Sequence, residues 1–128
     1  MLSRLVKMLA SELKMENDIT AHENGHYTLA FADEIDVEAF ELSKSLLLKG
    51  NIAAAPEKNR EAIFIQIMEA NLFGSGTRSA TIGWLESDNM LTLCRELDYN
   101  CSEKEFKEKL EDFVSVIDFW RKRVLKLA

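Results

Sequence analysis

Residues 56–73 are predicted to form a helix without a wide polar stripe, and this helix restricts the possible folds more than any other segment. Pro56 suits the first turn of a helix, because its missing N–H would be unpaired there, and Gly74 can adopt the left-handed conformation that ends one. At 100° per residue, apolar side chains occupy most of the circumference: Ala62, Ile63, Phe64, Ile65, Ile67, Met68, Ala70, Leu72 and Phe73. Such a helix must be covered on two sides.

Two arrangements satisfy this requirement. In a chain of 128 residues, one sheet layer covers one side of the helix. The second side is covered either by another copy of the chain or by the C-terminal helix, in a three-layer core. Burial of one further Phe or Ile contributes about 1.5–3 kcal/mol, so a symmetric contact of this helix with itself could hold a homodimer together.

Further elements flank this helix on both sides. Leu2, Leu5, Val6, Leu9 and Leu13 recur at helical spacing and predict a helix over residues 2–15. Strands are predicted over residues 27–31, 35–42 and 45–49, the last ending at Gly50. The alternation within 35–42 changes phase between Val37 and Phe40, which predicts a bulge or burial on both faces.

The C-terminal half continues with a hairpin and a long helix. Apolar runs at 79–85 and 90–94 flank a polar turn at 86–89. Ser102 and Glu105 form a capping box before an apolar stripe of Phe106, Leu110, Phe113, Ile117, Trp120 and Val124. The basic run Arg121–Arg123, with Lys126, predicts a solvated helix end.

The element order therefore predicts one domain, residues 1–128, of the α+β class. We expect two layers: an antiparallel five-stranded sheet and three helices, in the order α-β-β-β-α-β-β-α.

Composition narrows the possible partners. With 22 acidic and 16 basic side chains the net charge is −6, which repels phosphate backbones and anionic lipid, so neither nucleic acid nor a membrane is an expected partner. No apolar run approaches the roughly 20 residues that cross a bilayer, and Arg4 and Lys7 interrupt the apolar core that a signal peptide needs. We expect a cytoplasmic protein whose Cys94 and Cys101 are reduced thiols.

One motif suggests catalysis. Residues 22–26 read His-Glu-Asn-Gly-His, which matches the H-E-x-x-H pattern of zinc proteases, with His22 and His26 as ligands and Glu23 as base. The pattern requires a helix, whereas Asn24-Gly25 favours a turn. Ser75, between two glycines, lacks the rest of a phosphate-loop pattern and is expected in a connecting loop. We expect no catalytic residues, metal or cofactor, with a zinc hydrolase and a regulatory dimerisation module as the alternatives.

The chain also resembles a known family over nearly its whole length. The residues that carry the resemblance are Ala70-Asn71-Leu72-Phe73-Gly74, Ser79-Ala80-Thr81-Ile82-Gly83 and Leu91-Thr92-Leu93-Cys94-Arg95. They are similar to class I type III secretion chaperones of the Tir-chaperone (CesT-like) family. The resemblance implies a non-enzymatic homodimer in the bacterial cytoplasm. Such a protein binds the N-terminal segment of a secreted effector in extended form and keeps it soluble and competent for secretion, by strand addition and apolar grooves.

The resemblance also suggests residue roles. In the family the second helix and the following strand commonly form the dimer contact, which corresponds here to Ile63, Phe64, Ile67, Met68, Ile82 and Trp84. Effector grooves involve the first helix and the neighbouring sheet, so the expected effector-binding residues are Leu5, Leu9, Phe31, Phe40 and Leu42.

Overall fold

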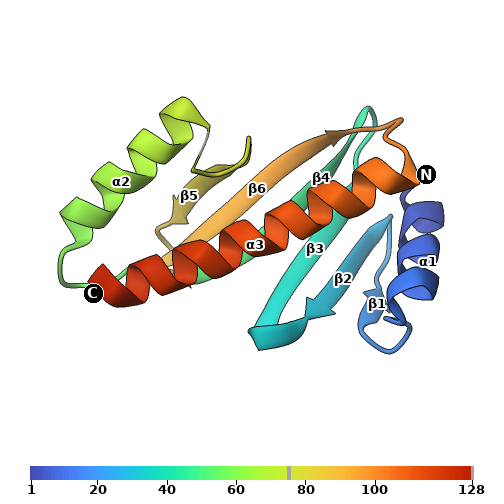
Figure 1. The fold of residues 1–128 in the computed structure, drawn as a ribbon, viewed down its shortest axis with the longest axis horizontal. Coiled ribbons are helices and arrows are strands. Elements are labelled where there is room, and N and C mark those ends of the chain that lie inside the picture. Colours follow the sequence, from blue (N-terminus) through green and yellow to red (C-terminus); the bar gives the residue numbers. More distant parts are fainter. Residues whose placement is uncertain (75, 128) are drawn as a thin grey trace.

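A computed structural model describes residues 1–74 and 76–127, so the expected loop position Ser75 lies outside the described residues. Its elements, in chain order, are α1 (Leu2–Leu13), β1 (Ile19–Ala21), β2 (His26–Phe31), the 3₁₀ turn η1 (Ala32–Glu34), β3 (Ile35–Glu41), β4 (Ser45–Ala54), α2 (Arg60–Phe73), β5 (Thr81–Leu85), β6 (Met90–Asp98) and α3 (Glu103–Leu127) (Figure 1). All neighbouring strands are antiparallel, in the order β1-β2-β3-β4-β6-β5. This is the predicted α+β class.

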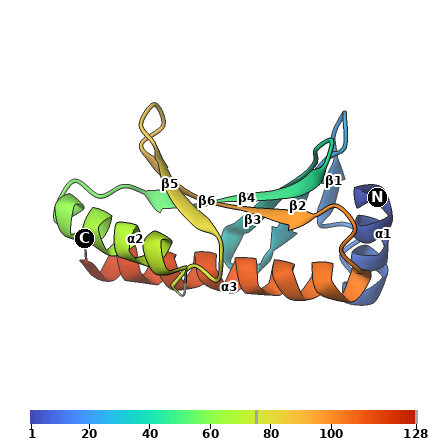
Figure 2. The ribbon, with the colours of Figure 1, turned by 90° about the horizontal axis from the view of Figure 1, so that it is seen from above.

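The molecule has two layers. Figure 2 shows α2 and α3 on one side of the sheet, with α1 beside the N-terminal end of α3. Strand residues that face the helices form the core with Leu5, Phe106 and Phe113, and they include Leu29, Val37, Leu48 and Leu93. The alternate strand residues lie on the other side, which the described helices leave uncovered. We call this side the open face, and it carries Thr28, Glu38, Phe40, Leu47 and Lys49.

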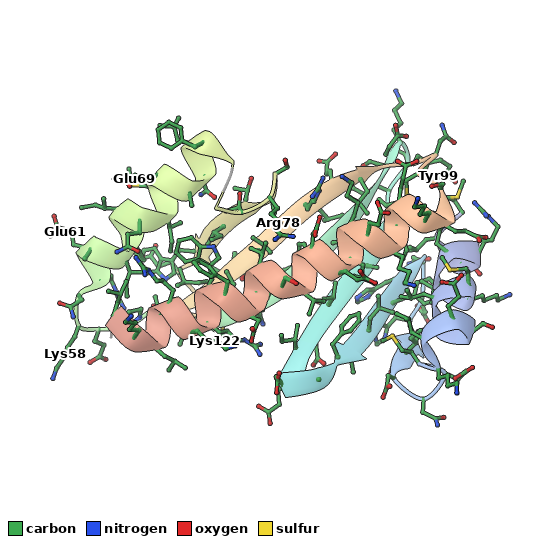
Figure 3. All side chains as sticks on the ribbon, in the orientation of Figure 1. Lys58, Glu61, Glu69, Arg78, Tyr99 and Lys122 are labelled. Carbon is green, nitrogen blue, oxygen red and sulfur yellow. The ribbon has the colours of Figure 1, made fainter. Side chains whose placement is uncertain are left out.

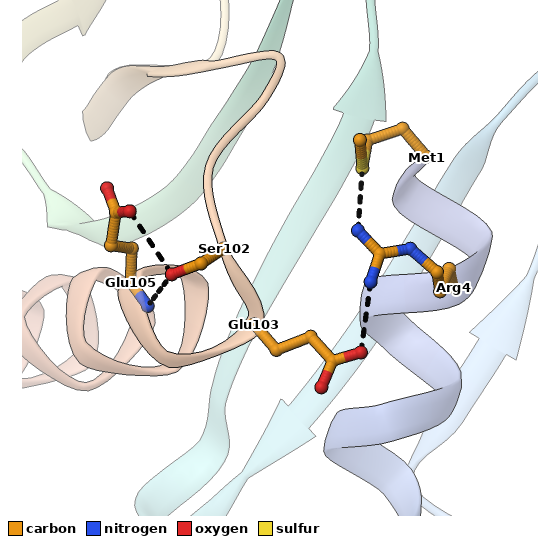
Figure 4. Close-up of polar contacts among 5 residues, drawn as sticks. All are labelled: Met1, Arg4, Ser102, Glu103 and Glu105. Atoms are coloured by element: carbon orange, nitrogen blue, oxygen red, sulfur yellow. Dashed lines mark hydrogen bonds and ion pairs between the residues drawn. The ribbon is translucent and has the colours of Figure 1, made fainter.

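The long helix α3 holds the layers together. The predicted capping box is confirmed, because Ser102 Oγ accepts a hydrogen bond from the Glu105 N–H at 3.1 Å (Figure 4). Beside it, Arg4 of α1 donates to Glu103 at 3.0 Å. The basic helix end is exposed at Lys122, Arg123 and Lys126, as predicted. Arg121 differs, because its guanidinium donates to the carbonyls of Ile52, Asp33 and Asn51 at 2.7, 3.0 and 3.2 Å.

The sheet has six strands, not the five predicted. The sequence did not predict strand β1, because it is only three residues long. Thr20, Ala21 and the residues directly after them are exposed, so no alternation of apolar and polar residues indicates a strand there. Strands β4 and β6 run on to Ala54 and Asp98 because they pair with each other along their whole lengths.

Two further details differ from the sequence-based expectation. Helix α2 begins at Arg60 instead of Pro56, since Asn59 has a left-handed φ of 58°. The register of β3 is continuous with both neighbouring strands, and the bulge lies in β4 between Asn51 and Ala53. The phase change in β3 instead reflects burial on both faces, because Val37 is buried under the helices and Phe40 is half-buried on the open face.

Candidate functional site

Helix α2 carries apolar side chains on two opposite sides. Ile63 and Ile67 are buried against the sheet. Ile65, Met68 and Leu72 lie on the opposite side at helical spacing and are 49%, 67% and 77% exposed. We call these three residues the α2 stripe. The charged side chains of Glu61 and Glu69 project from the same helix into solvent beside it (Figure 3).

Helix α3 does not cover the α2 stripe. It reaches α2 along another side, where Arg123 Nε donates to Gln66 Oε1 at 3.0 Å. The exposure of the stripe therefore excludes the three-layer arrangement as the cover for this side of α2. Ile65 and Leu72 were not among the predicted interface residues, although their spacing of three and four residues from Met68 was visible in the sequence.

A shallow groove of about 210 Å³ lies between α2 and β5, next to the stripe. Its lining residues are Phe64, Ile67, Met68, Asn71, Ile82, Gly83, Trp84 and Leu91. The rings of Phe64 and Trp84 pack across it with centroids 5.3 Å apart. Except for Asn71, its side chains are apolar, so the groove offers contact area and lacks the convergent polar groups of a small-molecule site.

A polar network fixes Trp84 in the wall of this groove. Trp84 Nε1 donates to Asn89 Oδ1 at 3.1 Å, and Arg60 donates to the same oxygen at 3.3 Å. Arg60 also lies over the Trp84 ring, 5.5 Å from its centroid. Because Asn89 in turn donates to the Ala55 carbonyl at 3.0 Å, the groove wall is tied to the end of β4.

The six predicted interface residues therefore divide into two groups. Ile63, Ile67 and Ile82 are buried in the core of the chain itself. Phe64 is half-buried, and Met68 and Trp84 are exposed, so only these three are available on the surface of this chain.

The five predicted effector-binding residues are not brought together. Leu5 and Leu9 are 0% exposed, because the apolar stripe of α1 faces its own core, and this corrects their assignment to a surface groove. Phe31 lines a groove with Met15, Asp18, Ala30 and Ala32. Phe40 lies on the open face, and Leu42 is exposed in the turn after β3.

The two histidines lie at the β1–β2 hairpin and not on a helix. Their ring centroids lie 4.5 Å apart with the planes tilted by 32°, and the His26 ring stacks on Phe40 with centroids 4.2 Å apart. His22 Nε2 is 2.8 Å from Thr28 Oγ1, and His26 Nε2 is 3.1 Å from Glu38 Oε1. Within residues 1–74 and 76–127 no three metal-ligating side chains cluster. The H-E-x-x-H match therefore lacks the helix that the zinc hydrolase alternative requires.

The two cysteines are free thiols. Burial raises the pKa of Cys94 and also that of Cys101, where Glu105 and Asp98 add to the effect. A raised pKa keeps a thiol protonated and therefore a poor nucleophile. Among the described helices, none is long and apolar enough to cross a membrane.

A two-layer domain with apolar grooves and an uncovered helix stripe is typical of a protein-binding module. A family model described as the Tir chaperone protein (CesT) family matches residues 4–121. The chain therefore belongs to this family of type III secretion chaperones. As a chaperone it is not an enzyme, in agreement with the prediction from the sequence.

Individual proteins share the length or the fold of this chain. A Chlamydia pneumoniae protein, CPj0713/CpB0740, is 24% identical over 122 residues, which cover 94% of this chain and 93% of that protein. A chain of the ExsC-ExsE complex aligns over 93% of this chain and 90% of its own length, with a TM-score of 0.73 and 20% identity. A chain of the HopA1-SchA chaperone-effector complex aligns over 94% of this chain and 92% of its own length, with a TM-score of 0.72 and 12% identity.

A third solved structure covers the complete chain. The Yersinia pestis type III secretion chaperone SycH, in complex with a fragment of YscM2, aligns over 100% of both chains with a TM-score of 0.67 and 20% identity. The described fold is thus the fold of these chaperones, and the predicted family is confirmed.

Proposed function

We propose that this chaperone is a homodimer in the bacterial cytoplasm that binds the N-terminal segment of a secreted effector in extended form. The effector would thereby stay soluble and competent for export through a type III secretion system. The observation that carries the homodimer is the α2 stripe, which lies opposite the buried side of the same helix. Family membership supports the effector as partner.

The stripe offers apolar area for a dimer contact. Full burial of an Ile, Met or Leu side chain contributes about 1.5–3 kcal/mol as an upper bound. A twofold contact uses the stripe of each copy, so six side chains would contribute on the order of 10 kcal/mol, comparable with the cost of association. Phe64 and Trp84 in the adjoining groove add apolar area beside the stripe.

Met68→Glu tests the dimer. It places a charge at the centre of the stripe, where Met68 is 67% exposed, so the monomer should fold normally while the dimer contact is lost. Ala62→Glu is the matched control, because Ala62 is exposed on α2 outside the stripe. We expect light scattering to give a dimer for the wild type and for Ala62→Glu and a monomer for Met68→Glu. A dimeric Met68→Glu variant would reject this interface.

The open face and the β1 edge support binding of an extended segment. In β1, hydrogen bonds from Ala30 N to Asp18 O and from His22 N to His26 O show that residues 18, 20 and 22 point toward β2. The backbone groups of Ile19 and Ala21 therefore point outward, and within the described residues they have no partner. Phe40 and Leu42 lie near this end of the sheet and offer apolar contacts for alternate side chains of an added strand.

Effector binding is tested with the purified chain and a candidate effector. The chain is first isolated under native conditions from its bacterium, and proteins that remain bound are identified by mass spectrometry. The N-terminal 100 or so residues of a secreted protein found in this way are then purified and titrated against the chain. Two copies of the chain per effector segment are expected by light scattering.

Two leucine variants sharpen this test. Leu42→Asp should weaken binding of the effector segment, since it adds a charge beside the proposed contact surface. Leu125→Asp should leave binding unchanged, because Leu125 is also exposed but lies near the end of α3, on the helical side of the sheet. Equal effects of both substitutions would show that the effector binds elsewhere.

A further inference from the structure

Strand β5 forms one edge of the sheet, where unpaired backbone groups would accept an added strand. In an antiparallel pair, the N–H and C=O of alternate residues point away from the partner strand. On β5 the outward-pointing residues are Ile82 and Trp84, and Ala80 directly precedes the strand on the same side. Each of these positions is a possible anchor for strand addition.

The side-chain amide of Asn71 occupies the central position. Asn71 Nδ2 donates to the Ile82 carbonyl at 2.9 Å, and the Ile82 N–H donates to Asn71 Oδ1, also at 2.9 Å. This pair of hydrogen bonds reproduces what a neighbouring strand would make with one residue. The amide lies in the last turn of α2, which ends where the N–H of Gly74, in the left-handed conformation, donates to Ala70 O at 2.9 Å.

On one side of Ile82 an outward backbone group is also engaged, and on the other side α2 packs against a side chain of the strand. The Ala80 N–H donates to the Thr77 carbonyl at 3.1 Å. Next to the backbone of Trp84, the Trp84 ring packs against Phe64 of α2. An incoming strand would therefore have to displace Asn71, and it would find no run of free backbone groups along β5.

We infer that Asn71 is a positioning residue that closes the β5 edge of the sheet to strand addition. Its amide supplies one donor and one acceptor at the spacing of a peptide group, whereas aspartate supplies only acceptors and leucine neither. Among residues 1–74 and 76–127, no side chain caps the β1 edge in this way at Ile19 and Ala21. If the proposed binding of an extended effector holds, Asn71 directs the added strand to the β1 end and keeps the sheets of different copies from joining at β5.

Asn71→Leu tests the closure in the protein alone, without an effector. Leucine has a similar volume and leaves both backbone groups of Ile82 unpaired. We expect hydrogen exchange of the Ile82 amide, followed by NMR at low protein concentration, to become on the order of tenfold faster. As the concentration is raised, the variant should form larger assemblies than the wild type in light scattering, and the Ile82 amide should regain protection.

A second substitution separates edge closure from a loss of stability. Thr81 is exposed on β5, and a lysine at a sheet edge opposes edge-to-edge pairing through charge. The double variant Asn71→Leu with Thr81→Lys should therefore return to the size of the wild type. Thr81→Lys alone should match the wild type. If Asn71→Leu does not fold, Asn71→Ala removes the same two hydrogen bonds and carries the same expectations.

Three results would overturn the inference. The first is an Ile82 amide that is as protected in the variant at low concentration as in the wild type. The second is faster exchange without concentration-dependent assembly, which would make Asn71 only an anchor of α2. Assembly that persists in the double variant would show that it does not proceed through β5. Failure of effector binding would reject the proposed function, but it would not change the hydrogen-exchange and light-scattering results that test Asn71.

Discussion

Gly50 of β4 lies where side chains of α3 pack against the sheet. A Cβ at this position would come within 2.6 Å of Ile117 Cδ1 and 3.3 Å of Phe113 Cε2, whereas a Cβ at Gly83 would meet nothing within 4 Å. Gly50→Ala should therefore lower the free energy of unfolding by about 1–3 kcal/mol through overpacking. Gly83→Ala, in a strand of the same sheet, should change it little. Urea denaturation of both variants measures the difference, and equal stabilities would contradict this account.

Glu41 acts as a cap for α1 from a distance in sequence. Helix α1 has no side-chain cap of its own at Met1, and Glu41 Oε1 accepts a hydrogen bond from the Leu2 N–H at 2.7 Å. This bond holds the pKa of Glu41 below its ordinary value, assisted by the amino group of Met1 and opposed by burial. A lowered pKa in the folded state stabilises the protein above the ordinary carboxyl pKa, and this stabilisation is lost as the pH falls through the lowered value.

The Glu41→Gln variant tests this linkage. Between about pH 5 and pH 3 its free energy of unfolding should fall less steeply than that of the wild type, because one carboxylate with a lowered pKa is gone. Denaturant titrations at a series of pH values measure the slope. Glu12→Gln serves as control, because Glu12 is exposed and forms only a 3.6 Å surface pair with Lys107. Identical slopes for the wild type and Glu41→Gln would contradict the linkage.

At the scale of elements, Arg121 joins α3 to a split in the sheet. Pairing of β3 with β4 ends at Val37 and Gly50, next to the bulge in β4, and the Arg121 guanidinium bonds carbonyls on both sides of the gap. It thereby satisfies carbonyl groups that lie beyond the last paired residues of β3 and β4.

Arg121→Met should therefore lower the free energy of unfolding by about 1.5–3 kcal/mol, the range for hydrogen bonds from a charged donor. Lys122→Met provides the control in the next residue, because its pair with Asp118 at 2.9 Å is an exposed contact within one helix. That variant should lose no more than about 0.5 kcal/mol. Thermal or denaturant unfolding distinguishes the two, and equal losses would count against the role of Arg121.

At the scale of the whole molecule, the α2 stripe couples stability to assembly. If folding and dimer formation are linked, the thermal midpoint of the wild type rises with protein concentration, because association favours the folded state. Met68→Glu should abolish this dependence while leaving the midpoint near that of the dilute wild type. Scanning calorimetry over a hundredfold range of concentration is the measurement. A wild-type midpoint independent of concentration would argue against the homodimer.

The sequence by itself determined the elements whose signals are local. Three features follow from residue spacing along the chain, and the structure has all three where they were expected. They are the apolar stripe of α3, the capping box of Ser102 and Glu105, and the turn at 86–89. The all-round apolar character of α2 likewise predicted that its own sheet would leave one side bare, because a layer covers only one side of a helix.

Tertiary structure alone decided which apolar residues remain on the surface. Leu5 and Leu9 carry the same kind of signal as Met68 and Leu72, yet the first pair is buried in the core of the chain and the second is exposed. The periodicity of a sequence indicates which side of a helix is apolar, but it does not indicate which other part of the protein covers that side. The contacts of Asn71 with Ile82, Glu41 with Leu2 and Arg121 with the split sheet join residues 11 to 88 positions apart. Such pairs depend on how whole elements pack, and no local pattern in the chain encodes that packing.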